Sequence, residues 1–241
     1  MSASKSGARL RAEAARVLDA VVKEGRSLDR ALVQSDERIA LTDRPMMRML
    51  CYGCLRHYWH LRWQLQQLLD KPLKARDSVI ESLLIVGLFQ LSDTRVPDHA
   101  AVSTTVEAAR LLKRPKLAGL INAILRNFLR RKSNEKEPQD DEARFNHPGW
   151  LIDRLRQDWP DHWRQIIAAN NARAPMWLRI GPHYKNAEDY LAKNEVEGTL
   201  LPGIDSALQL SRPVPVEELP GFDAGHVSVQ DGAAQLAAPW L

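Results

Sequence analysis

DSVIESLLIVGLFQL, residues 77–91, is the most apolar stretch of this chain of 241 residues. The stretch is long enough for about four helical turns, and a helix of this composition is apolar on nearly every side. Such a helix is stable only when neighbouring helices surround it. Residues 77–91 therefore predict a central helix, and the flanking segments are expected to supply the helices that cover it.

The flanking segments carry the apolar spacing of three and four residues that is typical of amphipathic helices. Leu10, Ala14, Val17 and Leu18 follow this spacing, and Gly25 is expected to end their helix. The same spacing predicts a short helix after Ser27, one beginning near Pro45, one through Trp63–Leu69, one after Pro97 and one from Leu117 to Phe128. No segment of residues 1–132 alternates apolar and polar residues as a half-buried strand does. The sequence predicts a mainly α fold, with an all-helical bundle over residues 1–132.

A different pattern begins after residue 132. Residues 133–145 open with the polar, mostly acidic run SNEKEPQDDE, which buries too little apolar area to fold alone and is interpreted as a linker. Residues 146–241 predict a small α+β unit, with short helices near 150–159 and 162–170 and strands at 177–180, 207–210 and 226–229. A further helix begins after Asp231, and an apolar Trp240-Leu241 follows it. We therefore expect the chain to be cut from something longer.

Charge is divided unevenly along the chain. Residues 1–132 contain 24 Lys and Arg against 13 Asp and Glu, a net charge of +11, whereas residues 133–241 have a net charge of −7. This asymmetry indicates that one half faces a polyanion such as nucleic acid. A basic surface that is merely solvated gives the same totals, so the positions of the cations decide between the two interpretations.

Three clusters of cations lie within residues 1–132. One lies in the first helix, one at the break before the last helix, and one at the end of that last helix. Lys and Arg in such clusters contact RNA phosphates, although cations at the carboxyl end of a helix also stabilise the helix itself. Two weaker candidates lie in the second unit. The predicted RNA-binding residues are Lys5, Arg9, Arg11, Lys113, Arg114, Lys116, Arg126, Arg130, Arg131, Arg173 and Arg179.

Cys51, Cys54, His57 and His60 recur every three residues and are all of metal-ligating types. On one straight helix, three such steps place His60 opposite Cys51, so the four side chains cannot surround one tetrahedral ion. We therefore predict no metal site and interpret the cysteines as buried core thiols. The sequence also contains no GxGxxG, GxxxxGKS/T, GxSxG or HExxH motif, so no catalytic or cofactor-binding residue is assigned.

The composition is that of an ordinary globular protein, with 44% apolar and 27% charged residues, which excludes disorder as the main state. No apolar run approaches the ~20 residues that cross a bilayer, and the first residues lack the pattern of a signal peptide. Two cysteines cannot supply the disulfide framework of a small secreted protein. We expect a cytoplasmic protein with no membrane partner.

Several segments together resemble one family. PDHAAVSTTVE (97–107), KRPKLAGLINAILR (113–126) and residues 38–55 are similar to NusB-like domains, specifically those fused to bacterial 16S rRNA cytosine-C5 methyltransferases. ANNARAPMWLRI (169–180) resembles the start of the small amino-terminal subdomain of these enzymes. LPGF (219–222) and VSVQDGAAQ (227–235) resemble the last motif before their catalytic domain.

The resemblance implies a separate role for each domain. An all-helical NusB-like domain over residues 1–132 helps bind 16S rRNA, and a small α+β subdomain over residues 146–241 extends the RNA surface. That subdomain packs on a Rossmann-like catalytic domain, which in the family binds S-adenosylmethionine and carries two catalytic cysteines. The cofactor loop and both cysteine motifs are absent from this sequence, and Cys51 and Cys54 do not match them. The chain is therefore expected to bind no S-adenosylmethionine and to be inactive alone.

Two other functions stay open at this point. A stand-alone NusB-like RNA-binding factor in transcription antitermination or ribosome assembly would share the helical domain, but it has no need of residues 145–241. A helical adaptor for proteins would use the same bundle without affinity for RNA. The resemblance of residues 146–241 to the methyltransferase subdomain favours the amino-terminal part of an rRNA methyltransferase.

Overall fold

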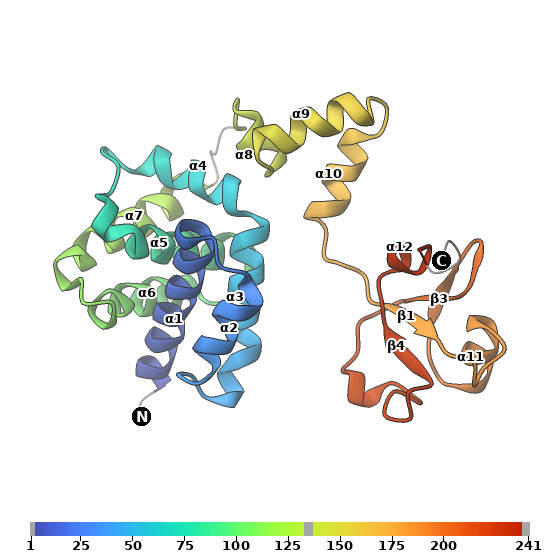
Figure 1. The fold of residues 1–241 in the computed structure, drawn as a ribbon. Coiled ribbons are helices and arrows are strands. Elements are labelled where there is room, and N and C mark those ends of the chain that lie inside the picture. Colours follow the sequence, from blue (N-terminus) through green and yellow to red (C-terminus); the bar gives the residue numbers. More distant parts are fainter. Residues whose placement is uncertain (1–2, 133–136, 238–241) are drawn as a thin grey trace. The chain divides into compact units, whose positions relative to one another are not determined.

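The computed structural model describes residues 3–132 and 137–237, and it divides the chain into two compact units, Met1–Asn171 and Ala172–Leu241. The first unit is helical and the second contains a small sheet (Figure 1), which confirms the predicted fold class. The predicted apolar end at Trp240-Leu241 lies outside the described residues. Within the described ranges, no helix combines the length and the apolar character that crossing a membrane requires.

Helix α5 (Ser78–Asp93) lies at the centre of the first unit and packs against α1, α3, α4, α6 and α7. Every residue from Ser82 to Leu91 is buried. This confirms the central position that the apolar stretch predicts, because a helix buried on all sides has no face left for water. The helices around α5 are α1 (Ala3–Glu24), α3 (Arg44–Arg56), α4 (Tyr58–Leu68), α6 (Asp98–Leu111) and α7 (Ala118–Arg131), and α2 (Leu28–Asp36) packs on α1.

Two glycines shape this bundle. A Cβ atom at Gly53 would overlap the ring of Phe89, so glycine is what lets α3 and α5 meet there. Gly25 follows α1 with a φ of +68°, the left-handed conformation that commonly ends a helix. The end of α1 is therefore where the sequence predicts it.

The segment after α7 differs from the predicted linker. Residues 133–136 lie outside the described part, but Asp141–Phe145 form helix α8. The Asp140 carboxylate caps α8 by accepting a hydrogen bond from the Ala143 amide at 3.2 Å. A favourable cap lets a polar segment form a helical turn, so this part of the acidic run is ordered.

Helix α8 packs on α4, and the Asn146 side chain connects the two segments by hydrogen bonds. Its side-chain oxygen accepts a hydrogen bond from the His60 amide at 3.1 Å, and its side-chain nitrogen donates to the Arg56 carbonyl. Helices α9 (Gly149–Asp158) and α10 (Trp163–Asn171) continue from α8 around a small core. The compact units divide between residues 171 and 172.

The second unit is built on a four-stranded antiparallel sheet in the order β2-β3-β1-β4. Tyr190 from α11 is fully buried in its core, and its hydroxyl donates to the Pro220 carbonyl at 3.1 Å. Strand β2 is not among the predicted strands, because its four residues show no apolar alternation. The elements are β1 (Trp177–Ile180), α11 (Ala187–Lys193), β2 (Gly198–Leu201), β3 (Ile204–Leu210), β4 (Val227–Val229) and α12 (Gly232–Gln235).

Candidate nucleic-acid interface

The turn between α6 and α7 carries the second predicted cluster on a strained backbone. The chain reverses at Lys113, whose φ is +58°. The Lys113 amide donates to the Arg110 carbonyl (3.0 Å) and the Arg114 amide to the Ala109 carbonyl (2.9 Å), a helix-end pattern that usually places glycine at the reversal. A lysine there costs about 1 kcal/mol, yet its side chain is exposed. The turn presents Lys113 to solvent at a cost in stability.

Arg114 has a structural role in the same turn. Its Nε donates to Oδ1 of Asp77 at 2.7 Å, and its Nη2 donates to the Arg76 carbonyl at 2.8 Å. These bonds fix the turn to the segment that precedes α5. Lys116, in contrast, is exposed and has no hydrogen bond or ion pair to any described residue. Lys113 and Lys116 are therefore the cations of this turn that an RNA can reach most directly.

The third cluster lies at the carboxyl end of α7. Arg126 and Arg130 are one helical turn apart and both are exposed. Nε of Arg126 donates to Oδ1 of Asn122 at 3.0 Å, and Nη1 of Arg131 donates weakly to the Gln67 carbonyl at 3.5 Å. Arg130 makes no hydrogen bond or ion pair with the described residues. The cluster thus presents guanidinium groups that carboxylates of the described chain leave unneutralised.

The structure places the second and third clusters at opposite ends of one helix. Helix α7 has 14 residues and is about 20 Å long. Over that length an RNA strand presents several phosphates, so the distance between the clusters is compatible with contacts to one RNA. We call the exposed cations of these two clusters the α7 basic surface. Its members are Lys113, Lys116, Arg126, Arg130 and Arg131.

The first cluster, on α1, differs from its prediction. Arg11 is only 5% exposed, its Nε donates to Oε1 of Gln90 at 2.9 Å, and its Nη1 donates to the Gly7 carbonyl at 3.1 Å. Burial lowers the pKa of Arg11, and Asp43 offsets part of that shift. Arg11 is therefore a core residue. Arg9 is exposed, and the side chain of Lys5 lies outside the description.

In the second unit, Arg173 precedes β1 and Arg179 lies within it, and both are exposed. Nη1 of Arg179 donates to Oε1 of Gln230 at 3.4 Å. Trp177 is half-buried and packs against the backbone of Gly232, where a Cβ atom would lie 3.2 Å from the indole. The two arginines belong to a different compact unit from the α7 basic surface.

The Cys and His repeat spans two helices, so the expectation that it lies on one straight helix is wrong. Helix α3 ends at residue 56 and α4 begins at residue 58, with His57 at the junction, where its ring stacks on Phe89. Cys51 and Cys54 are buried, and burial raises the pKa of Cys51 to about 12. Across the described ranges, no group of three or more His, Cys, Asp or Glu side chains is arranged to hold a metal ion.

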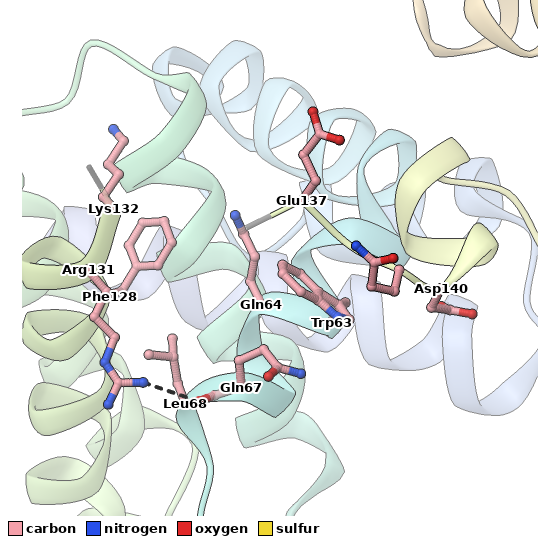
Figure 2. A pocket seen from close by; sticks show the side chains of 10 residues that line it. Trp63, Gln64, Gln67, Leu68, Phe128, Arg131, Lys132, Glu137 and Asp140 are labelled. Atoms are coloured by element: carbon pink, nitrogen blue, oxygen red, sulfur yellow. Dashed lines mark hydrogen bonds between the residues drawn. The ribbon is translucent and has the colours of Figure 1, made fainter. Parts of the chain in front are cut away.

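A cavity that the sequence does not predict lies beside the carboxyl end of α7. Figure 2 shows side chains from α4 and α7 around it, together with residues 137–140. The apolar spacing places Phe128 on the buried face of its helix and Trp63 in an amphipathic helix, but nothing in the spacing brings the two together. Only the packing of α4 beside α7 does so.

Two family models match successive parts of the chain. The NusB family matches residues 8–130, and the ferredoxin-like domain of RsmF/B-like methyltransferases matches residues 147–217. The crystal structure of PH0851 is similar in fold, with a TM-score of 0.65 and 16% sequence identity over 99% of this chain and 56% of that chain. The likeness to that structure concerns the fold alone.

Among curated proteins, the chain is similar to two relatives named ribosomal RNA small subunit methyltransferase B. The protein of Klebsiella pneumoniae subsp. pneumoniae is 40% identical over 98% of this chain and 56% of its own length. That of Vibrio cholerae serotype O1 is 44% identical over 96% of this chain and 55% of its own length. The chain thus spans about half the length of these curated relatives.

Proposed function

The chain belongs to the NusB family, and we propose that it is the RNA-binding amino-terminal part of an S-adenosylmethionine-dependent 16S rRNA cytosine-C5 methyltransferase. In this proposal the helical first unit contacts rRNA through the α7 basic surface. Arg9, Arg173 and Arg179 are secondary contacts, and Arg11 and Arg114 serve the fold. Methyl transfer is assigned to the part of the relatives' length that this chain does not span.

The order of the two family matches carries this proposal. A NusB match followed by a ferredoxin-like methyltransferase match occurs in one chain, and relatives named as rRNA methyltransferases align with nearly all of it. The alternative, a stand-alone NusB-like factor in transcription antitermination or ribosome assembly, accounts for residues 8–130 and leaves residues 147–217 without a role. The methyltransferase proposal accounts for both.

The residues of this chain do not fit a site for S-adenosylmethionine or for the attacking thiolate. Cys51 and Cys54 are buried, and burial holds the pKa of both thiols above its ordinary value, so neither is a nucleophile at neutral pH. None of the described residues that line the cavity beside α7 is a glycine, in contrast to the glycine-rich loops that cradle dinucleotide and nucleotide phosphates. We expect calorimetry with S-adenosylmethionine to show no stoichiometric binding, and stoichiometric binding would contradict this assignment.

Two further parts of the proposal concern location and folding. We place the protein in the cytoplasm, because its proposed partner, 16S rRNA, is there.

We also propose that residues 1–132 and 146–241 fold independently, which is supported by the two family matches ending at residue 130 and beginning at residue 147. Limited proteolysis tests this: first cuts within residues 133–145 support it, and first cuts after Arg173, at the division of the compact units, contradict it.

RNA binding by the α7 basic surface is tested by charge reversal. We expect the doubles Lys113→Glu/Lys116→Glu and Arg126→Glu/Arg130→Glu each to weaken binding to a helical-junction fragment of 16S rRNA at least about tenfold, because each removes two cations that neutralise phosphates. Arg30→Glu/Arg95→Glu is the matched control. It changes charge equally at two exposed cations outside α7 that have no bond to described residues.

Fluorescence anisotropy at two salt concentrations measures these affinities, with circular dichroism to confirm folding. The proposal is wrong if both α7 doubles bind as tightly as the parent chain, or if the control loses as much affinity as they do. The loss is expected for RNA of any sequence, because phosphate contacts position an RNA and do not read its bases.

A further inference from the structure

The cavity beside α7 has a volume of about 830 Å³ and lies wholly within the first unit. That volume is within the range of about 300–1,000 Å³ of small-molecule sites in proteins. In Figure 2 the indole of Trp63 and the side chain of Leu68 come from α4, and the ring of Phe128 comes from α7. These three side chains make the interior apolar, with the half-buried indole able to present a face to a flat ligand.

Two cations lie on the α7 side of this apolar interior, and Figure 2 shows their charged groups pointing away from each other. Nη1 of Arg131 donates to the Gln67 carbonyl at 3.5 Å, and Nζ of Lys132 donates to the Leu91 carbonyl at 2.6 Å. Each bond positions its side chain and uses one of several N–H donors. Neither cation forms an ion pair with a carboxylate in residues 3–132 or 137–237. Donors therefore remain for an anion at this side of the cavity.

The opposite side carries acceptors. Glu137 and Asp140 line it across from α7 in Figure 2, and the Asp140 carboxylate also caps α8 by accepting from the Ala143 amide at 3.2 Å. Carboxylates accept hydrogen bonds from the amino and imino groups of nucleobases, and they repel phosphate. The cavity thus has a cationic side, an apolar middle with an indole, and an acidic side. An RNA nucleotide has the same three parts in that order: a phosphate, a flat ring and a polar edge with donors.

We propose that this cavity binds one unpaired RNA nucleotide, with its base stacked on Trp63 and its phosphate beside Arg131. The acidic side disfavours a second phosphate, so the site takes a single nucleotide from a loop or bulge. Arg131 also belongs to the α7 basic surface, so the pocket continues that surface. This inference rests on the proposed RNA binding and adds a preference for single-stranded over duplex RNA, since a paired base cannot enter.

The test compares a 12-nucleotide single-stranded RNA with the same RNA annealed to its complement, each titrated against the full 241-residue chain. Stacking of one base contributes enough that Trp63→Ala should weaken single-strand binding roughly 5- to 150-fold. Duplex binding should change less than twofold. Trp63→Phe keeps an aromatic face and should retain most of the single-strand affinity. Trp59→Ala is the matched control, because Trp59 is a half-buried tryptophan of the same helix that does not line the cavity.

The outcomes separate this inference from the function on which it rests. Selective loss of single-strand binding in Trp63→Ala, with rescue in Trp63→Phe, supports the nucleotide site. Equal loss for both RNAs, no loss for either, or the same loss in Trp59→Ala overturns the site and leaves general RNA binding standing. A parent chain that binds neither RNA overturns both.

Discussion

Helices α1 and α7 carry similar clusters of cations, and the fold gives them different roles. On α1, Arg11 is almost fully buried and bonded to Gln90, because α1 is covered by α5 and α6. On α7, Arg126 and Arg130 are exposed, and neither forms an ion pair with a described residue. The number of cations in a helix therefore says little about binding. Their position relative to the buried face of the helix decides whether they serve the core or a partner.

The largest expected effect is the loss of stability when Arg11, the buried arginine of α1, is replaced. Arg11→Ala removes the hydrogen-bond partner of Gln90, which is itself fully buried, and leaves a cavity. We expect the free energy of unfolding to fall by roughly 2–4 kcal/mol. Urea denaturation followed by circular dichroism measures this loss.

Arg130, an exposed arginine of α7, supplies the control for that measurement. Arg130→Ala should change the free energy of unfolding by less than about 0.5 kcal/mol, as is usual for an exposed residue without partners. If Arg11→Ala is as stable as Arg130→Ala and loses affinity for RNA, then Arg11 is a contact residue and the comparison fails.

A smaller and opposite effect is expected at the α6–α7 turn. Lys113→Gly relieves the left-handed strain at φ +58° and should stabilise the fold by about 0.5–1 kcal/mol. The same change removes one cation of the α7 basic surface and should weaken RNA binding a few-fold. Thermal unfolding and anisotropy on one preparation test both effects. A variant that is stabilised without loss of affinity would show that Lys113 has no role in binding.

The smallest effect on stability at neutral pH is expected from the buried thiol of Cys51. Burial raises the pKa of Cys51 to about 12, from an ordinary value of 9.0. The stability linked to this thiol is complete below pH 9, and it is lost as the pH rises from 9 toward 12, because the unfolded thiol ionises first. Iodoacetamide at pH 8.5 should therefore alkylate Cys51 much faster in urea than in buffer. Equal rates would place the thiol at the surface.

Much of the helical unit follows from the sequence alone. The spacing of apolar residues locates the helices of residues 3–131, and the stretch at 77–91 identifies the central one. What the spacing does not reveal is contact between segments. Arg11 lies three residues after Ala8 and seven before Leu18, which places it on the buried face of α1. This helical spacing could have identified Arg11 as a core residue.

Other features depend on tertiary structure and have no local signal. Strand β2 lacks alternation and is held by pairing with β3, with Leu200 opposite Leu208. The acidic run becomes partly helical because Asp140 caps α8 and α8 packs on α4. The cavity between Trp63 and Phe128 exists only because α4 and α7 lie side by side. Spacing within one segment predicts none of these.

The salt dependence of RNA binding tests the central claim most directly. For the parent chain, the logarithm of the association constant should fall steeply with the logarithm of the salt concentration, because each phosphate that the protein neutralises releases counterions. Arg126→Gln/Arg130→Gln should reduce the magnitude of this slope by about one for each phosphate that is no longer neutralised. A parent slope near zero, or an unchanged slope in the double variant, would contradict RNA binding through the exposed face of α7.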